Sequence, residues 1–158
     1  MQAIESRLPR SPGLYRWRDD GLTPDARQLD GAVRSGEPLL IFIHGTGSST
    51  EGAFADLRAA AQAAQADWDT LEARYPGRIY ALEHRTFSDS PIENALLLVR
   101  ALPQGARVDL VTHSRGGLVG DLLAADWSNE GQTGSLIDNY RRLVHGDEPV
   151  TAESLADL

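Results

Sequence analysis

The chain has 158 residues, of which 41% are hydrophobic and 24% charged, a composition typical of a single globular domain, here expected to span residues 1–158. The formal net charge of −8 argues against binding to nucleic acid or to an anionic membrane, because clustered Lys and Arg hold phosphate surfaces. The absence of cysteine excludes disulfides, thiolate metal sites and a cysteine nucleophile.

The segment before Pro38 is expected to be rich in β-structure. Residues 12–18 carry Leu14, Tyr15 and Trp17 among polar residues, and the turn sequence Asp19-Asp20-Gly21 follows, so a hairpin strand is predicted. The N-terminus lacks the long apolar stretch of a secretory signal, and no apolar run in the chain is long enough to cross a bilayer. We therefore expect a cytoplasmic protein without a transmembrane segment.

The next elements alternate between strand and helix. Residues 39–43 form a continuous β-prone apolar run, which predicts a strand covered on both faces of a sheet. From Glu51 to Tyr75 apolar residues recur at helical spacing until Pro76-Gly77, which predicts one long helix or a bent pair. Residues 78–83 then return to strand character.

Two further elements complete the alternation. Ser90 at an N-cap, Pro91 at the first helical position and Glu93 at the third predict a helix over residues 91–102. A strand at 108–112 and a helix at 115–125 follow. Strands and helices that alternate with short connections predict an α/β fold, a mostly parallel sheet with helices on both faces.

The segment VDLVTHSRGGL, residues 108–118, carries the clearest chemical signal. A strand leads into Ser114 and then into a helix start with Gly116 and Gly117, the pattern of a nucleophile elbow, which lifts a serine hydroxyl above the sheet on a sharp turn. Small residues are needed two positions before and after the serine. Gly116 meets this need, whereas Thr112 departs from the G-x-S-x-G pattern and is a tighter fit.

A second motif, His44-Gly45-Thr46-Gly47, directly follows the strand at 39–43. Acyl transfer places negative charge on an oxygen, and pre-aimed backbone N–H groups stabilise that charge. The glycine turn is expected to supply one donor near Gly45 and Thr46. The amide of Arg115, at the N-terminus of its helix, is expected to supply the other.

The pair LLIFIHGTGSS and VDLVTHSRGG resembles the N-terminal half of a lipase-like serine hydrolase of the α/β-hydrolase family, over about residues 38–126. The resemblance implies Ser114 as nucleophile, Arg115 and a residue of the Gly45-Thr46 turn as oxyanion donors, and a small ester or lipid-like acyl substrate. It implies no cofactor.

The chain departs from this family after Ser114, where the family places an acid and then a histidine. His145 is the only histidine downstream, and we therefore treat it as a candidate base. The downstream acids include Asp121, Asp126, Asp138 and Asp147. We expect a sheet that is incomplete at its C-terminal end, the N-terminal portion of a larger hydrolase domain. The base would then come from His145, from a missing segment or from a partner chain.

A non-catalytic interaction or regulatory module is the alternative. An incomplete sheet would expose the edge of the strand at 108–112, which predicts a homodimer or strand exchange. Among the other histidines, His44 is expected to bond neighbouring backbone, His113 to point away from the serine, and His84 to lie at the same sheet edge. No metal site is expected, because the four histidines lack ligand spacing.

Overall fold

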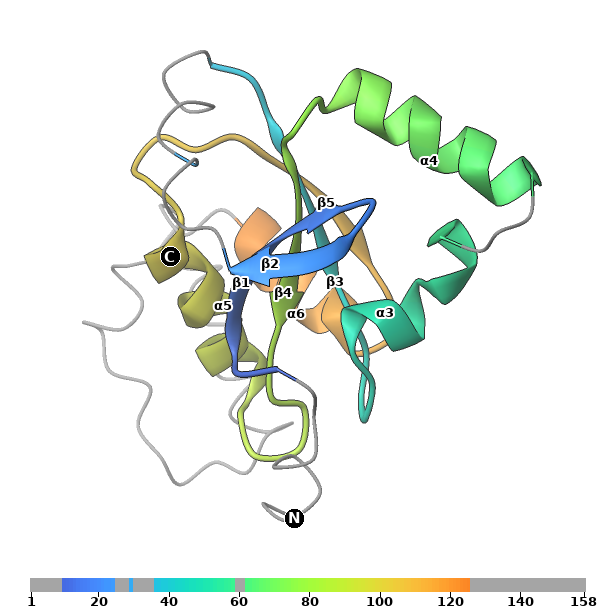
Figure 1. Cartoon of the computed structure of the whole chain (residues 1–158). Coiled ribbons are helices and arrows are strands. Elements are labelled where there is room, and N and C mark those ends of the chain that lie inside the picture. Colours follow the sequence, from blue (N-terminus) through green and yellow to red (C-terminus); the bar gives the residue numbers. More distant parts are fainter. Residues whose placement is uncertain (1–9, 25–28, 30–35, 59–61, 126–158) are drawn as a thin grey trace, which may run out of the picture.

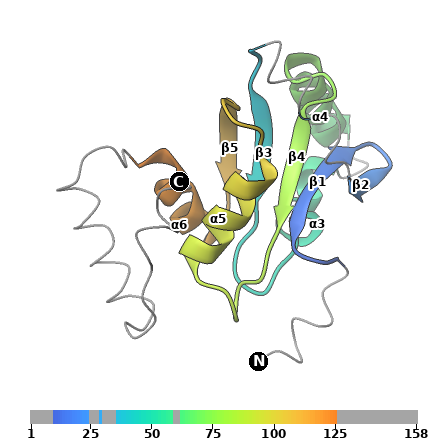
Figure 2. The ribbon, with the colours of Figure 1, turned by 90° about the vertical axis from the view of Figure 1, so that its left-hand side faces the viewer.

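The computed structural model describes residues 10–24, 29, 36–58 and 62–125. Over these residues the chain has a mixed α/β fold, in which a five-stranded sheet is covered by helices on both faces (Figure 1 and Figure 2). The elements in chain order are β1 (Gly13–Arg18), β2 (Gly21–Pro24), β3 (Leu39–Ile43), α3 (Thr50–Ala53), the 3-10 helix η1 (Ala55–Arg58), α4 (Gln62–Arg74), β4 (Ile79–Glu83), α5 (Pro91–Ala101), β5 (Val108–Thr112) and α6 (Gly116–Ala124).

The strand order in the sheet is β2-β1-β4-β3-β5. Strand β3 is central and runs parallel to both β4 and β5, with Ile43 opposite Leu82 on one side and Thr112 on the other. Strands β1 and β2 form the predicted hairpin, which pairs antiparallel to β4. The sheet is therefore parallel over β4, β3 and β5 and antiparallel at its N-terminal edge.

The two faces of the sheet have different cores. Leu39, Ile41 and Ile43 face a mainly aliphatic cluster with α5 and α6, whereas Leu40 and Phe42 face an aromatic cluster with Trp17 and Trp68. This follows from strand geometry, because successive side chains point to opposite faces. Figure 2 shows α5 and α6 on one side of the sheet and α3 and α4 on the other. Strand β3 is apolar at every position because both of its faces are buried.

The local signals for strands and caps are confirmed. Strands β3 and β5 have the predicted bounds, and β4 begins one residue after the predicted start. Helix α5 begins at Pro91 with a capping box: the Ser90 side chain accepts from the Glu93 amide, and the Glu93 side chain accepts from the Ser90 amide. In the described ranges, no helix has the length and apolar character needed to span a bilayer.

The segment from Glu51 to Tyr75, predicted as one long helix or a bent pair, is divided into α3, η1 and α4. Phe54 ends α3 with φ −124°, outside helical backbone geometry. Its ring packs 5.1 Å from that of Phe42 and 6.5 Å from that of Trp17. Packing onto the aromatic face therefore overrides the helical propensity of this segment.

Candidate active site

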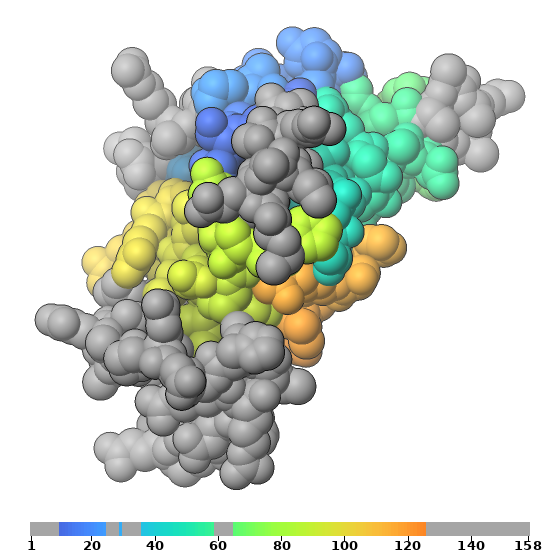
Figure 3. Space-filling model, turned by 90° about the horizontal axis from the view of Figure 1, so that it is seen from below, coloured from blue at the N-terminus to red at the C-terminus, as the bar shows by residue number. Residues whose placement is uncertain are grey.

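The three parallel strands end at the same edge of the sheet, at the lower end of the view in Figure 1. Seen from below, the segments that follow β3, β4 and β5, coloured teal, yellow-green and orange, lie next to one another (Figure 3). Ligands of open α/β sheets bind at the carboxyl ends of such strands. The predicted glycine turn and the predicted serine elbow are therefore on adjacent strands of one edge.

Ser114 lies on a sharp turn between β5, which ends at Thr112, and α6, which begins at Gly116. It has φ +55°, the left-handed region, and is the one residue other than glycine with positive φ in the described ranges. A β-branched or ordinary side chain rarely adopts this backbone without a compensating reason. Ser114 is an exposed residue, so the turn carries it at the surface.

Glycines let the two turns approach each other closely. A Cβ on Gly45 would lie 2.8 Å from the Cβ of Ser114 and 3.0 Å from the carbonyl oxygen of His113. A Cβ on Gly116 would overlap the carbonyl oxygen of Ile43 and lie 2.8 Å from that of His44. The glycine turn and the serine elbow are therefore in direct backbone contact, as their motifs predict.

Thr112 stands where the pattern prefers a small residue, and Gly120 makes room for it. A Cβ on Gly120 would lie 2.9 Å from the Thr112 methyl carbon, because α6 passes directly over the end of β5. A glycine at position 112 would leave space in the elbow. Here Gly120, one helical turn after Gly116, provides that space instead. Sequence reasoning did not identify Gly120, although its position four residues after Gly116 places it on the same face of α6.

The expected oxyanion donors have open backbone N–H groups. Across the residues that the structure describes, no hydrogen bond engages the N–H of Thr46 or that of Arg115. The neighbouring N–H of Gly47 is already used, because it donates to the Thr86 hydroxyl at 2.9 Å. The Arg115 side chain donates to the carbonyl oxygen of Asp89 at 2.8 Å and so ties the elbow to the loop after β4.

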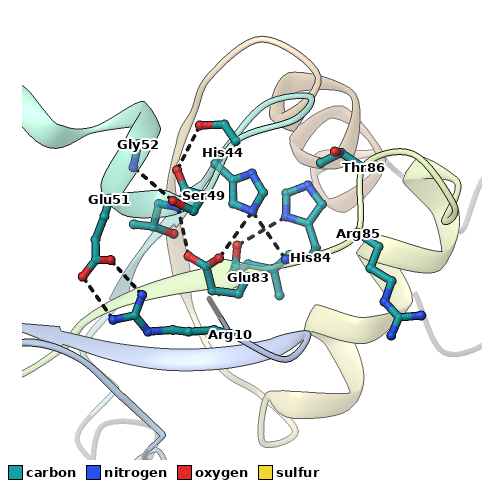
Figure 4. Close-up of polar contacts among 12 residues, drawn as sticks. Arg10, His44, Ser49, Glu51, Gly52, Glu83, His84, Arg85 and Thr86 are labelled. Carbon is teal, nitrogen blue, oxygen red and sulfur yellow. Dashed lines mark hydrogen bonds and ion pairs between the residues drawn. The ribbon is translucent and has the colours of Figure 1, made fainter. Parts of the chain in front are cut away.

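A buried polar cluster lies behind the glycine turn (Figure 4). His44, Glu83 and His84 are each at most 3% exposed. The Glu83 carboxylate accepts from the Thr50 amide at 2.9 Å and lies 3.8 Å from Nε2 of His44. The His44 and His84 rings stack with centroids 4.1 Å apart. Buried polar groups are costly unless they are paired, and here His44 and Glu83 are paired with backbone groups of Gly45 and Thr50.

His84 is held neutral by its surroundings. Burial, followed by the neighbouring His44, lowers the pKa of His84 from 6.5 to about 4. Its Nδ1 lies 3.3 Å from the Leu82 carbonyl oxygen, whereas its Nε2 has no hydrogen-bond partner in the described part of the chain. His84 lies at the expected sheet edge but is buried, so it does not present its ring to the surface beside Ser114.

The remaining predicted residues have mixed outcomes. His44 bonds neighbouring backbone as expected, since its Nδ1 lies 3.0 Å from the Gly45 carbonyl oxygen. His113 is exposed, with its ring 6.3 Å from that of Phe54. Asp121 is exposed on α6. The candidate base His145 lies outside the described residues, as do Asp126, Asp138 and Asp147.

Sequence reasoning did not identify Glu83 or Thr86, which hold the glycine turn from the end of β4. A charged residue that ends a fully buried strand is the signal that marks Glu83, because such a group needs partners. No group of three or more His, Asp or Glu side chains suited to a metal ion occurs among the residues described.

The fold and the site together define a mixed α/β protein that carries a strained serine turn against a glycine turn at the strand ends. The chain belongs to the family described as Domain of unknown function (DUF7379), whose family model matches residues 9–157. No curated protein and no solved structure matches the chain.

Proposed function

We propose that this chain is a serine hydrolase of the α/β-hydrolase type, acting on an ester or related acyl substrate through an acyl-enzyme on Ser114. One observation carries the proposal: Ser114 has left-handed backbone, φ +55°, on a strand-to-helix turn packed against Gly45. A serine that only capped a helix would have extended backbone, and its turn would not be strained. The strained elbow is the geometry that exposes a nucleophilic hydroxyl above a sheet.

The oxyanion site supports the same chemistry. The loop after β3 and the residue after the nucleophile are where enzymes of this type place their two amide donors. Here those positions are the Gly45-Thr46 turn and Arg115, and the N–H groups of Thr46 and Arg115 are open within the described residues. The amide of Arg115 also lies at the N-terminus of α6, where the helix dipole favours an anion.

The proposed cycle has two steps. In the first step the Ser114 oxygen attacks the acyl carbon, the carbonyl oxygen becomes an oxyanion held by the amides, and the alcohol leaves with the proton that the base removed. In the second step the base takes a proton from water, the water oxygen attacks the acyl carbon, and the carboxylic acid leaves as Ser114 recovers its proton from the base. His145 follows Ser114 in the chain order of such enzymes, and we propose it as the base unless a longer chain or a partner supplies one.

A fluorophosphonate probe tests the proposal, because it forms a covalent bond only with an activated serine. The full chain is expected to be labelled at Ser114, and Ser114→Ala is expected to abolish labelling. Ser88→Ala makes the same chemical change at an exposed serine of the loop after β4 and is expected to leave labelling intact. Equal labelling of wild type and Ser114→Ala, at any level, contradicts the proposal.

A second function is favoured by the edge strand. The burial pattern of β5 is mixed, whereas every residue of β3 and β4 is buried, and within the described residues β5 pairs on one side only, with β3. A strand edge of this kind pairs readily with another chain, which suits a non-catalytic interaction module. Light scattering distinguishes the two functions, since a monomer at high concentration removes support for the module.

A further inference from the structure

We propose that His44 and Glu83 are positioning residues that aim the Thr46 N–H at the oxyanion, a role that rests on the proposed hydrolase function. Neither residue contacts the substrate in this proposal. They act on the six-residue turn from His44 to Ser49, which joins β3 to α3 and carries the oxyanion donor.

The first step concerns the peptide between Gly45 and Thr46. Nδ1 of His44 lies 3.0 Å from the Gly45 carbonyl oxygen, and since a carbonyl only accepts, this nitrogen carries the proton and donates. The peptide unit is planar and trans, so its C=O and N–H point in opposite directions. By holding the Gly45 oxygen, His44 therefore fixes the direction of the Thr46 N–H.

The second step places that N–H beside the nucleophile. The backbone at Gly45 is so close to Ser114 that a Cβ on Gly45 would lie 2.8 Å from the serine Cβ. A rotated peptide would turn the Gly45 oxygen toward the serine and present a negative dipole to the developing oxyanion. The orientation of this one peptide thus decides whether the turn stabilises or opposes the transition state.

The third step is the clamp that Glu83 forms on the far end of the turn (Figure 4). One carboxylate oxygen accepts from the amide of Thr50, directly after the turn, at 2.9 Å. The other oxygen lies 3.8 Å from Nε2 of His44, a contact without a hydrogen bond, because Nε2 accepts from the His84 amide when Nδ1 carries the proton. A carboxylate that is 3% exposed is costly without partners, and here a single side chain joins two backbone segments.

Two neighbours reinforce this arrangement. The His84 ring stacks on His44 and its amide donates to Nε2 of His44 at 3.4 Å, which fixes the plane of the His44 ring. Thr86 accepts from the Gly47 amide, so the turn is also held just beyond Thr46. The Thr46 amide lies between these contacts in the chain, and no hydrogen bond engages it within the described residues.

The test compares two replacements of His44. His44→Phe keeps a ring to stack on His84 but removes the donor to Gly45, whereas His44→Asn retains an N–H near the position of Nδ1. The rate constant of fluorophosphonate labelling is expected to fall about tenfold to a hundredfold in His44→Phe, since loss of an oxyanion donor costs about a hundredfold or more. The affinity for the probe before reaction is expected to be unchanged, and His44→Asn is expected to recover most of the rate.

The second comparison concerns Glu83. Glu83→Gln keeps an acceptor for the Thr50 amide and is expected to label faster than Glu83→Ala, which has none. Glu51→Ala is the matched control, because Glu51 is an exposed acid of α3 that pairs with Arg10 and does not hold the turn. It is expected to label at the wild-type rate.

Amide hydrogen exchange separates this inference from the proposed function. An unlabelled wild type overturns the proposed function, and exchange then still tests the clamp. The Thr50 amide is expected to exchange faster in Glu83→Ala than in wild type or Glu51→Ala. Wild-type labelling by folded His44→Phe, equal impairment of His44→Asn and His44→Phe, or unchanged Thr50 exchange in Glu83→Ala overturns the positioning role.

Discussion

The aromatic face of the sheet and the strand ends show two different uses of burial. Trp17, Phe42 and Trp68 pack edge to face with centroids 5.0 and 5.1 Å apart, and the guanidinium of Arg58 lies 4.3 Å from the Trp68 ring. At the strand ends, His44 and Glu83 are just as buried but polar. The aromatic face gains stability from the burial of apolar area, whereas the buried polar groups at the strand ends hold the backbone of the glycine turn in one orientation.

The comparison implies that the two regions respond differently to substitution. A change on the aromatic face is expected to alter the free energy of unfolding and to leave the chemistry of the folded protein unchanged. A change at the strand ends is expected to alter the chemistry, or to alter how stability depends on pH and on backbone strain. Three predictions test this difference.

The largest stability effect is expected at Trp68, which is 1% exposed. Trp68→Ala is expected to lower the free energy of unfolding by about 3–5 kcal/mol, because it leaves a cavity on the aromatic face. Chemical denaturation measures the loss, and labelling per folded molecule is expected to match wild type. Trp68→Phe is the control with a smaller loss, since the indole Nε1 has no hydrogen-bond partner within the described residues.

The next effect is the dependence of stability on pH through His84. Its pKa is about 4 in the folded protein and 6.5 in the unfolded chain, so the unfolded chain binds the proton first as pH falls. The stabilising contribution is fully present above pH 6.5 and is lost as pH falls through about 4, a loss of about 3 kcal/mol. Unfolding midpoints measured across this range check the sign.

The control for this pH dependence is His84→Phe, which keeps a ring against His44 but has no titrating nitrogen. Its stability is expected to vary less than that of wild type between pH 6.5 and pH 4. Profiles that coincide over this window would assign the acid sensitivity to other groups.

The smallest effect on stability is expected at Ser114, where a substitution is expected to stabilise the protein rather than destabilise it. Ser114→Gly relieves the left-handed backbone and is expected to be more stable than Ser114→Ala by about 1 kcal/mol. Both variants are expected to lack fluorophosphonate labelling. A Ser114→Gly variant that is no more stable than Ser114→Ala in chemical denaturation would show that the elbow is not strained.

The elements that local sequence determines were predicted correctly. The run at 39–43 and the Ser90-Pro91-Ile92-Glu93 cap depend on neighbours within one strand or one helical turn, so their signals are local. The contact between the two motifs was also predictable, because a close approach of backbone requires glycine at Gly45 and Gly116.

The parts that depend on distant partners were not predictable from one sequence. Glu83 binds an amide 33 residues away, and Thr86 binds one 39 residues away, and neither pairing leaves a periodic pattern. The end of α3 at Phe54 was missed for the same reason, because the aromatic rings that attract it come from β1 and β3. Helical spacing shows which residues share one side of a helix, but it does not show which distant residues that side will pack against.

The adjacent glycines of α6 differ in how much change each position tolerates. At Gly116 the obstacle is main-chain oxygen on β3, which no rotamer change can move aside. At Gly117 the nearest atom to a new methyl group is the Thr112 hydroxyl oxygen, at an ordinary 3.8 Å. The two adjacent glycines therefore differ in the substitutions that they can accept. The space beside Gly117 has room for a methyl group, whereas a side chain at Gly116 would require the central strand itself to shift.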